Sequence, residues 1–257
     1  MSAVVLAVLH AAAALLGSAL ADQFQERTFA YKSADDASRT VAYRLLAPPR
    51  LLPGEKYPLV IFLHGKGNRG NDNTSQLAVF PDWMASAEIR KKYPCFLLAP
   101  QCPGDRDWSA RWWDKRQPPP SDPDEPLVQV VGMMDEIIKT KPIDQHRVYL
   151  TGLSMGGFGS WELAARFPER FAAVAPLCGG GNKNNADRLA NLPIWCFHGD
   201  KDDQVPVQFS RDMIDAIKKA GGHPKYTELP GVGHDCWNTA YKPASGLIQW
   251  MFVQRRP

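Results

Sequence analysis

The chain lacks several features, and each absence excludes a class of protein. Among its 257 residues, no run of lysine and arginine is longer than the three at 90–92, and the formal net charge is only +3. Short basic runs of this kind are ordinary solvated surface, so we do not expect nucleic acid as a partner. The five cysteines contain no CxxC pair, which argues against a zinc site and against thioredoxin-type redox chemistry. There is no internal repeat and no break in composition, so residues 22–257 are predicted to form a single domain.

Charge is absent from the first part of the chain. Between Ser2 and Ala21 there is no Asp, Glu, Lys or Arg, and the stretch ends in ALA just before Asp22. A signal peptidase reads small residues at these positions, so we predict a signal peptide over residues 1–21 and an exported mature protein. The alternative is a membrane anchor formed by residues 2–21, because the n-region has no Lys or Arg and about 20 apolar residues can span a bilayer. No second apolar stretch of that length follows, so no stable membrane partner is expected after cleavage.

The odd number of cysteines leaves at least one of them outside any intramolecular disulfide. Cys95 and Cys102 flank an apolar strand, and at about 3.3 Å per residue they lie too far apart to pair with each other. Cys178 and Cys196 are expected to be buried and inert.

Apolar, strand-like runs alternate with segments of helical periodicity along most of the chain. This alternation predicts an α/β protein with repeated βα units and a mostly parallel sheet that is covered on both faces. The expected strands cover residues 40–46, 59–63, 96–99, 147–151, 172–177, 194–197 and 226–229. The expected helical segments cover residues 127–138, 158–167, 207–219 and 247–252.

One region departs from this alternation. Residues 104–126 carry Trp108, Trp112, Trp113 and three consecutive prolines, and they are too polar and proline-rich for a core element. We interpret them as a long surface insertion, a kind of loop that is often functional. These three tryptophans and Trp237 are candidate substrate-binding residues, because aromatic rings suit a sugar face or a phenolic group. The alternative is that they pack the insertion onto the body of the protein.

The sequence GLSMG at residues 152–156 is the strongest indication of chemistry. It follows the apolar stretch Val148–Leu150 and precedes a helical segment that ends before Pro168. A strand, a sharp turn and a helix in this order are what a nucleophile elbow requires. We therefore predict Ser154 as a catalytic nucleophile; the alternative is a glycine-rich βα turn without chemistry.

A serine needs a base to remove its proton, and the base needs a carboxylate to orient it. In a protein with a nucleophile elbow the acid and then the histidine follow the serine along the chain. His234 lies in a glycine-rich loop just after the last predicted strand, so we prefer it as the base. His198 ends a strand and is expected to hold the next loop, and His223 lies in a turn that is expected to face solvent.

The carboxylate is expected in the loop after the strand that ends near residue 197. Asp200, Asp202 and Asp203 all lie there, and the residues by themselves do not choose among them.

Four short segments together resemble a known family. They are FLHG at 62–65, YLTGLSMGG at 149–157, HGDKDDQVP at 198–206 and GHD at 233–235. They are similar to the phospholipase/carboxylesterase and dienelactone-hydrolase relatives, and most closely to exported esterases related to feruloyl esterases and polyhydroxybutyrate depolymerases. The similarity covers residues 58–250. It implies the α/β-hydrolase fold, and it implies Asp202 as the acid, since this aspartate stands fifth in the His-Gly-x-x-Asp pattern.

The resemblance also bears on the oxyanion hole and on the substrate. The backbone N–H of Met155, directly after the nucleophile, is expected to be one oxyanion donor, and the resemblance implies the N–H of Lys66 as the other. Dienelactone hydrolases use a cysteine where this chain has Ser154, so a dienelactone is not expected as the substrate. No metal and no organic cofactor are implied.

These observations predict a serine carboxylic-ester hydrolase that works through an acyl-enzyme. The expected substrate is a small aromatic ester or an ester linked to a carbohydrate or polysaccharide. No long apolar lid is present, which argues against a true lipase. The alternatives are a serine peptidase with the same three residues and a non-catalytic binding protein on this fold.

Overall fold

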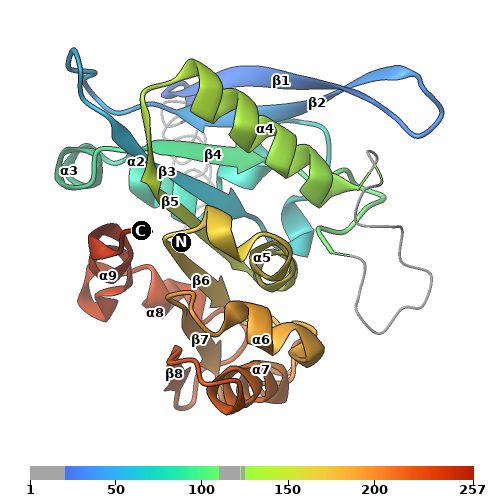
Figure 1. Ribbon diagram of the computed structural model, residues 1–257, viewed down its shortest axis with the longest axis vertical. Coiled ribbons are helices and arrows are strands. Elements are labelled where there is room, and N and C mark those ends of the chain that lie inside the picture. The colour runs from blue at the N-terminus through green and yellow to red at the C-terminus, as the bar shows by residue number, and fades with distance from the viewer. Residues whose placement is uncertain (1–20, 110–121, 123–124) are drawn as a thin grey trace, which may run out of the picture.

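The computed structural model describes residues 21–109, 122 and 125–257. Within them eight strands form one sheet in the order β1-β2-β4-β3-β5-β6-β7-β8 (Figure 1). Strand β2 runs antiparallel to both of its neighbours, and the strands from β4 to β8 are parallel to one another. The strands are β1 (Phe24–Lys32), β2 (Ser38–Leu46), β3 (Tyr57–Leu63), β4 (Phe96–Pro100), β5 (Ile143–Leu153), β6 (Ala173–Leu177), β7 (Trp195–Gly199) and β8 (Lys225–Leu229).

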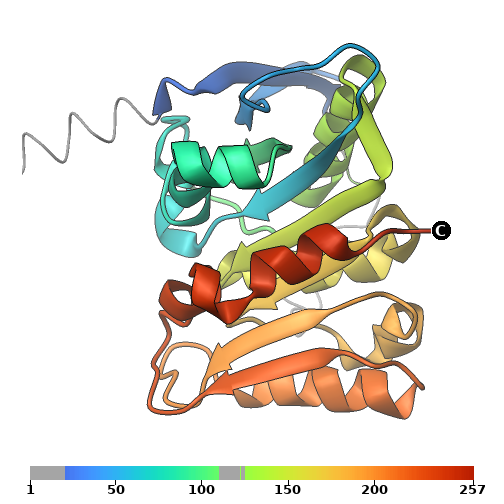
Figure 2. The same cartoon turned by 90° about the vertical axis from the view of Figure 1, so that its left-hand side faces the viewer.

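Helices cover both faces of the sheet. One face carries α2 (Phe80–Ala85), α3 (Ala87–Lys92), α8 (Trp237–Ala240) and α9 (Leu247–Val253), which lie toward the viewer in Figure 2. The other face carries α4 (Pro126–Thr140), α5 (Met155–Arg166), α6 (Ala186–Leu189) and α7 (Gln208–Lys219). Short 3₁₀ helices are η1 (Lys66–Asn68), η2 (Ser75–Leu77), η3 (Pro168–Arg170), η4 (Lys183–Asn185) and η5 (Pro243–Ser245).

The central strands are apolar throughout because both of their faces are buried. In β3, Leu59 and Ile61 point into the core under α4 and α5, while Val60 and Phe62 point into the core under α2 and α9. Successive side chains of a strand alternate between the two faces of a sheet, so a strand between two helical layers needs apolar residues at every position. This is why the strands at the centre could be recognised as continuous apolar runs.

The seven predicted strands are present, with ends that differ by up to four residues. The prediction missed β1, whose residues are mostly exposed and which pairs only with β2 in a long hairpin. An edge strand of this kind carries no apolar run, so its hydrophobic pattern is weak. Helices α2 and α3 were also missed, and with six residues each they are too short to show a helical period.

Three features of the sequence lie partly or wholly outside the described residues. These are residues 1–20 of the signal peptide predicted over residues 1–21, Trp112 and Trp113, and most of the predicted insertion. In the described part of the chain, no helix has the length and apolar character needed to cross a bilayer. All five cysteines are buried and none is in a disulfide, as expected for Cys178 and Cys196.

Candidate active site

Ser154 occupies a sharp turn between β5 and α5. Its backbone has φ 54° and ψ −119°, a left-handed conformation that is uncommon for a residue with a side chain. Its N–H donates to the carbonyl oxygen of Leu177 at 3.0 Å, which ties the turn to β6. The turn is tight because Gly156 packs against the backbone of β3, and a Cβ at that position would overlap the Leu63 carbonyl oxygen. Glycine is therefore required for α5 to start so close to the sheet.

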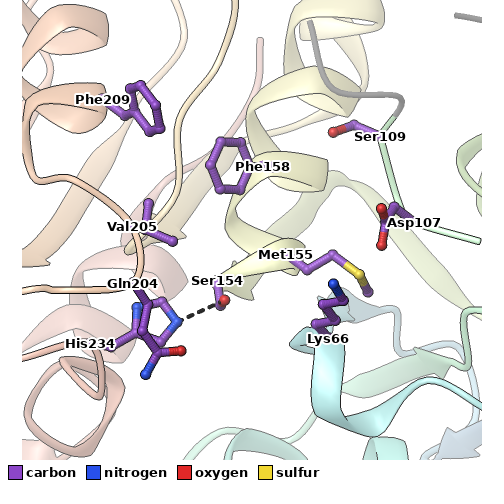
Figure 3. A pocket seen from close by; sticks show the side chains of 10 residues that line it. All are labelled: Lys66, Asp107, Ser109, Ser154, Met155, Phe158, Gln204, Val205, Phe209 and His234. Atoms are coloured by element: carbon purple, nitrogen blue, oxygen red, sulfur yellow. Dashed lines mark hydrogen bonds between the residues drawn. The ribbon is translucent and has the colours of Figure 1, made fainter. Parts of the chain in front are cut away.

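Two hydrogen bonds connect Ser154 to a histidine and a carboxylate. His234 Nε2 lies 2.8 Å from Ser154 Oγ, as the dashed line in Figure 3 shows. His234 Nδ1 lies 2.7 Å from Asp202 Oδ2. The three residues follow β5, β8 and β7 respectively, so the carboxyl ends of three parallel strands bring them together. A hydroxyl that contacts an imidazole, which in turn contacts a carboxylate, is the arrangement that activates a serine nucleophile.

The loop after β7 brings only one of its three candidate aspartates to His234. The side chain of Asp202 is fully buried, and its Oδ1 accepts the backbone N–H groups of Gln204 at 2.9 Å and Val205 at 2.8 Å. Asp200 instead accepts the backbone N–H of Gly231 at 2.7 Å, and Asp203 is exposed.

Burial and hydrogen bonding act in opposite directions on the carboxyl group of Asp202. Burial alone would raise its pKa, but the N–H of Val205, the His234 ring and the N–H of Gln204 together outweigh burial and lower the pKa. Donors that bond to the charged form stabilise it. Asp202 is therefore ionised at neutral pH, which is the state needed to orient an imidazole and to stabilise its protonated form.

The two predicted oxyanion donors both border the cavity beside Ser154. Met155 opens α5 and Lys66 opens η1, and an N–H group in the first turn of a helix has no acceptor within that helix. The loop that carries Lys66 is held by His64, whose Nδ1 lies 2.7 Å from the carbonyl oxygen of Gly65. On the other side of the ring, Nε2 accepts the N–H of Cys102 at 3.0 Å. Burial lowers the pKa of His64 to about 4, so the ring is neutral and serves as a rigid support.

A cavity of about 360 Å³ opens over Ser154 and has two chemically different sides. Phe158, Val205 and Phe209 form most of one side, next to Gln204, and in Figure 3 they lie away from Lys66, Asp107 and Ser109, which lie on the other side beside the side chain of Met155. In Figure 3 Ser154 lies between the two sides, and His234 lies beside it, below Val205. The cavity therefore offers apolar surface on one side of Ser154 and hydrogen-bonding groups on the other.

The structure corrects the role that we predicted for Trp108. This tryptophan is only 1% exposed, does not border the cavity, and donates its indole N–H to the carbonyl oxygen of His64 at 2.9 Å. It packs beneath the loop of Lys66. This position buries its large apolar ring and still gives its N–H a hydrogen-bond acceptor. The rings of Trp237 and His234 make a T-shaped contact, with 5.3 Å between their centroids. Trp237 is likewise not among the residues that border the cavity.

Among the residues that the structure describes, the aromatic ones that border the cavity were not predicted as site residues. Phe158 lies in the first turn of α5, and Phe209 lies in the first turn of α7. The centroids of the two rings are 6.1 Å apart. Phe209 fits the helical spacing of the core residues on its helix, so periodicity alone does not distinguish it from a core residue. What distinguishes both residues is their place at the start of a helix that follows a parallel strand. Such positions lie at the carboxyl ends of the strands, which is the edge of the sheet where ligands bind.

One group of potential metal ligands is found among the described residues, and it overlaps this site. Ligand atoms of Cys178, Asp202 and His234 lie within 4.8 Å of one another. Asp202 and His234 are already bonded to each other, and burial raises the pKa of the Cys178 thiol well above its usual value. The hydrogen bond between Asp202 and His234 accounts for the proximity of these two groups without a metal ion.

Comparison with known proteins identifies the fold and the family of this chain. Residues 53–251 match the phospholipase/carboxylesterase family. A solved structure described as a thermostable esterase has a TM-score of 0.81 and 37% sequence identity, over 92% of this chain and 64% of that chain. These matches confirm the predicted α/β-hydrolase fold.

Two named proteins show how the similarity extends at the level of sequence. Lysophospholipase-like protein 1 of Mus musculus is 27% identical over 204 residues, which cover 74% of this chain and 84% of the mouse protein. A protein of Arthroderma benhamiae, described as an uncharacterized secreted protein, is 28% identical over 138 residues, which cover 41% of this chain. The chain spans only 15% of that fungal protein and 64% of the thermostable esterase.

Proposed function

Since the chain belongs to the phospholipase/carboxylesterase family, we propose that it is a serine carboxylic-ester hydrolase whose nucleophile is Ser154. The observation that carries this proposal is the continuous hydrogen-bonded chain from Ser154 Oγ through His234 to Asp202. It lies at the open edge of the sheet and borders a cavity. A glycine-rich turn without chemistry would not need a base at hydrogen-bonding distance from its serine.

The geometry is consistent with a two-step reaction. His234 Nε2 takes the proton of Ser154 as Oγ attacks the ester carbonyl carbon, and the N–H groups of Met155 and Lys66 stabilise the resulting oxyanion. Collapse of this intermediate breaks the ester bond, His234 returns the proton to the departing alcohol, and an acyl-enzyme remains. Water, deprotonated by the same histidine, then attacks the acyl-enzyme. The bond from the acyl carbon to Ser154 Oγ breaks, His234 returns the proton to Oγ, and the acid is released.

The two-sided cavity favours a small ester with unlike halves. Phe158 and Phe209 suit a ring-sized apolar group, while Lys66, Asp107 and Ser109 suit a group rich in hydroxyls, such as a sugar. A cavity of about 360 Å³ lies near the lower end of the range for small-molecule sites, and a long acyl chain would extend beyond it. We therefore assign a small aromatic ester or a carbohydrate-linked ester as the substrate class.

The place of action follows from the N-terminal segment. The uncharged stretch before Asp22 has the features of a signal peptide, and the fungal relative is described as secreted. Both observations support an exported enzyme that meets its ester outside the cytoplasm.

The experiment that tests the proposal uses the chain from Asp22 to Pro257 with a fluorophosphonate probe and a series of p-nitrophenyl esters. We expect one covalent label per chain, together with hydrolysis of the short-chain esters. Ser154→Ala should remove both, while Ser38→Ala, which changes an exposed serine at the start of β2, should keep both.

The same experiment separates the alternatives. Faster cleavage of an anilide than of the ester with the same acyl group would favour a peptidase. If the parent chain is folded but is neither labelled nor active, the proposal is wrong and a binding protein becomes the better interpretation.

A further inference from the structure

Asp202 contacts a second histidine that the proposed reaction does not use. His198 lies near the end of β7, and its side chain is fully buried, as is that of Asp202. Its Nε2 is 3.1 Å from Asp202 Oδ2, the same oxygen that contacts His234 Nδ1 at 2.7 Å. The Nε2 atom is also 2.9 Å from the carbonyl oxygen of Val205. One carboxylate oxygen therefore lies between two imidazole rings.

The partners of His198 determine which ring nitrogen carries the proton. Both partners of Nε2 are acceptors, an ionised carboxylate and a carbonyl, so Nε2 must carry a hydrogen and donate it. Nδ1 lies 2.7 Å from Ser210 Oγ. Burial lowers the pKa of His198, despite the opposing effects of Val205 and Asp202. The ring is therefore neutral at neutral pH, and Nδ1 accepts the hydroxyl hydrogen of Ser210.

The far end of this chain of hydrogen bonds is consistent with that assignment. Ser210 Oγ also lies 3.1 Å from the carbonyl oxygen of Gly179, but donation there would force a hydrogen onto His198 Nδ1 and give the ring a buried positive charge. The Cys196 thiol lies 3.3 Å from Ser210 Oγ, and burial raises the pKa of this thiol to about 12. The thiol therefore keeps its hydrogen and donates it to Ser210.

All the donors in this buried chain therefore point the same way. The thiol of Cys196 donates to Ser210, Ser210 donates to His198, and His198 donates to Asp202. Such a chain polarises each successive donor toward the carboxylate. Together with the N–H groups of Gln204 and Val205, which bond to Oδ1, this chain fixes the orientation of the Asp202 carboxylate.

We propose that His198 is a positioning residue for the proposed reaction: it holds Asp202 Oδ2 toward His234 and, by sharing the charge of that oxygen, sets the pH at which His234 becomes a base. This proposal rests on the proposed function, in which His234 is the base. It differs from a purely structural role, because a histidine that only filled the core would not affect the protonation of another histidine.

Other groups near the two rings must stay constant for the test to be clear. Those around His234 border the same cavity, belong to the same cluster of side chains or adjoin it in the chain, and one group on β8 interacts with His198. These titratable or charged groups are Lys66, Asp107, Cys178, Asp202, Asp235, Cys236 and Glu228. All of them are unchanged in the variants below, so a difference between variants reports on position 198.

The test compares His198→Leu, which removes the donor, with His198→Gln, whose amide NH₂ can reach the place of Nε2. Both are measured per active site titrated with the fluorophosphonate probe. We expect His198→Leu to lower kcat by about 10- to 100-fold, as for a small displacement of a catalytic group, with KM little changed because His198 does not border the cavity. Without its second donor, Asp202 stabilises protonated His234 more strongly, so the acid limb of kcat/KM should move up by roughly half a pH unit.

His198→Gln should restore most of kcat and return the acid limb to its original pH. His223→Gln, at an exposed histidine in a turn, is the matched control and should behave as the parent. The inference is overturned if His198→Leu keeps the parent acid limb, or if its loss of activity only follows a loss of folded protein in the thermal unfolding curve.

A second measurement keeps this inference separate from the proposed function. The ring resonances of His234 are followed by NMR against pH in the parent chain and in His198→Leu. If the parent has no esterase activity, the proposed function fails, yet a higher protonation midpoint of His234 in the variant would still support the coupling. Equal midpoints in the two proteins would refute it.

Discussion

Four of the chain's histidines show that surroundings, and not residue type, decide a role. His64 and His198 are buried, each donates from one ring nitrogen and accepts at the other, and each has a lowered pKa. The side chain of His234 remains about 10% exposed and contacts a hydroxyl at the edge of a cavity. His223 is exposed in a turn, as predicted. The ring of His234 is therefore accessible from the cavity, whereas the rings of His64 and His198 are enclosed.

The lowered pKa of His64 predicts a dependence of the stability of the protein on pH. Burial lowers this pKa from 6.5 to about 4, so between these values the unfolded chain binds a proton that the folded protein does not. The contribution is fully present above pH 6.5 and declines as the pH falls toward 4, by roughly 3 kcal/mol in all. Urea unfolding at pH 7, 5.5 and 4 measures it.

The comparison variant is His64→Gln, which keeps hydrogen-bonding groups but does not titrate. Its free energy of unfolding should fall less than that of the parent between pH 6.5 and 4. Equal losses in the two proteins would assign the effect to other groups.

At the scale of elements, the turn from β5 to α5 determines where Ser154 lies. Gly152 and Gly156 pack against each other and against the end of β3, and a Cβ on either one would collide with backbone atoms. The same end of β3 leads into the loop of Lys66. The proposed nucleophile and one proposed oxyanion donor are therefore positioned by one close contact between backbones.

Gly156→Ala should separate α5 from β3 and displace Ser154 relative to Lys66. A shift of about 1 Å at a reacting group can cost about 100-fold in rate, and overpacking a core typically costs about 1–3 kcal/mol of stability. We expect a loss of esterase activity of that order in protein that still folds, measured by kcat/KM and thermal unfolding. Gly104→Ala, where the added Cβ meets no atom within 4 Å, is the control. Wild-type activity in Gly156→Ala would show that the turn tolerates the side chain.

Helices α5 and α7 together form the apolar side of the cavity through Phe158 and Phe209. Phe209→Ala should therefore reduce kcat/KM at least tenfold more for an ester with an aromatic half, ethyl benzoate or phenyl acetate, than for ethyl acetate. The small ester acts as an internal control for the integrity of the site. An equal loss for all three esters would mean that Phe209 supports the fold of the site and does not contact the aromatic group.

On the scale of the whole molecule, the topology of the sheet assembles the site. Ser154, Asp202 and His234 are separated by up to 80 residues along the chain, yet each follows a parallel strand at the same edge of the sheet. The loops at that edge carry the three proposed catalytic residues, while the two helical layers hold the strands in place. The sheet begins only at Phe24, after the segment that we predict to be removed on export.

Export leads to a prediction about the mature protein. When the full chain is secreted by a bacterial host, N-terminal sequencing should give Asp22 as the first residue, because the small residues Ala19 and Ala21 form the cleavage signal. The intact mass should match residues 22–257. Recovery of the full-length chain in the membrane fraction would instead support an anchor formed by residues 2–21.

Local patterns in the sequence were enough to predict the central strands, the turn at Ser154 and the preference for His234. Continuous apolar runs reveal strands that are buried on both faces, and a glycine-rich turn between strand and helix identifies the elbow. These features depend on neighbours within a few residues. Strand β1 escaped because an exposed edge strand carries no such run.

Other features depended on residues that meet only after folding. The sequence by itself left Asp200, Asp202 and Asp203 equivalent, and the preference for Asp202 came from a family resemblance; the structure brings Asp202 alone to His234. Trp108 was a candidate binding residue because of its aromatic ring, but it is buried beneath the loop of Lys66. Hydrophobic periodicity indicates which side of an element is apolar. Whether that side faces the core or a cavity depends on the elements packed opposite it. Phe209 can therefore be distinguished from a core residue only in the folded protein.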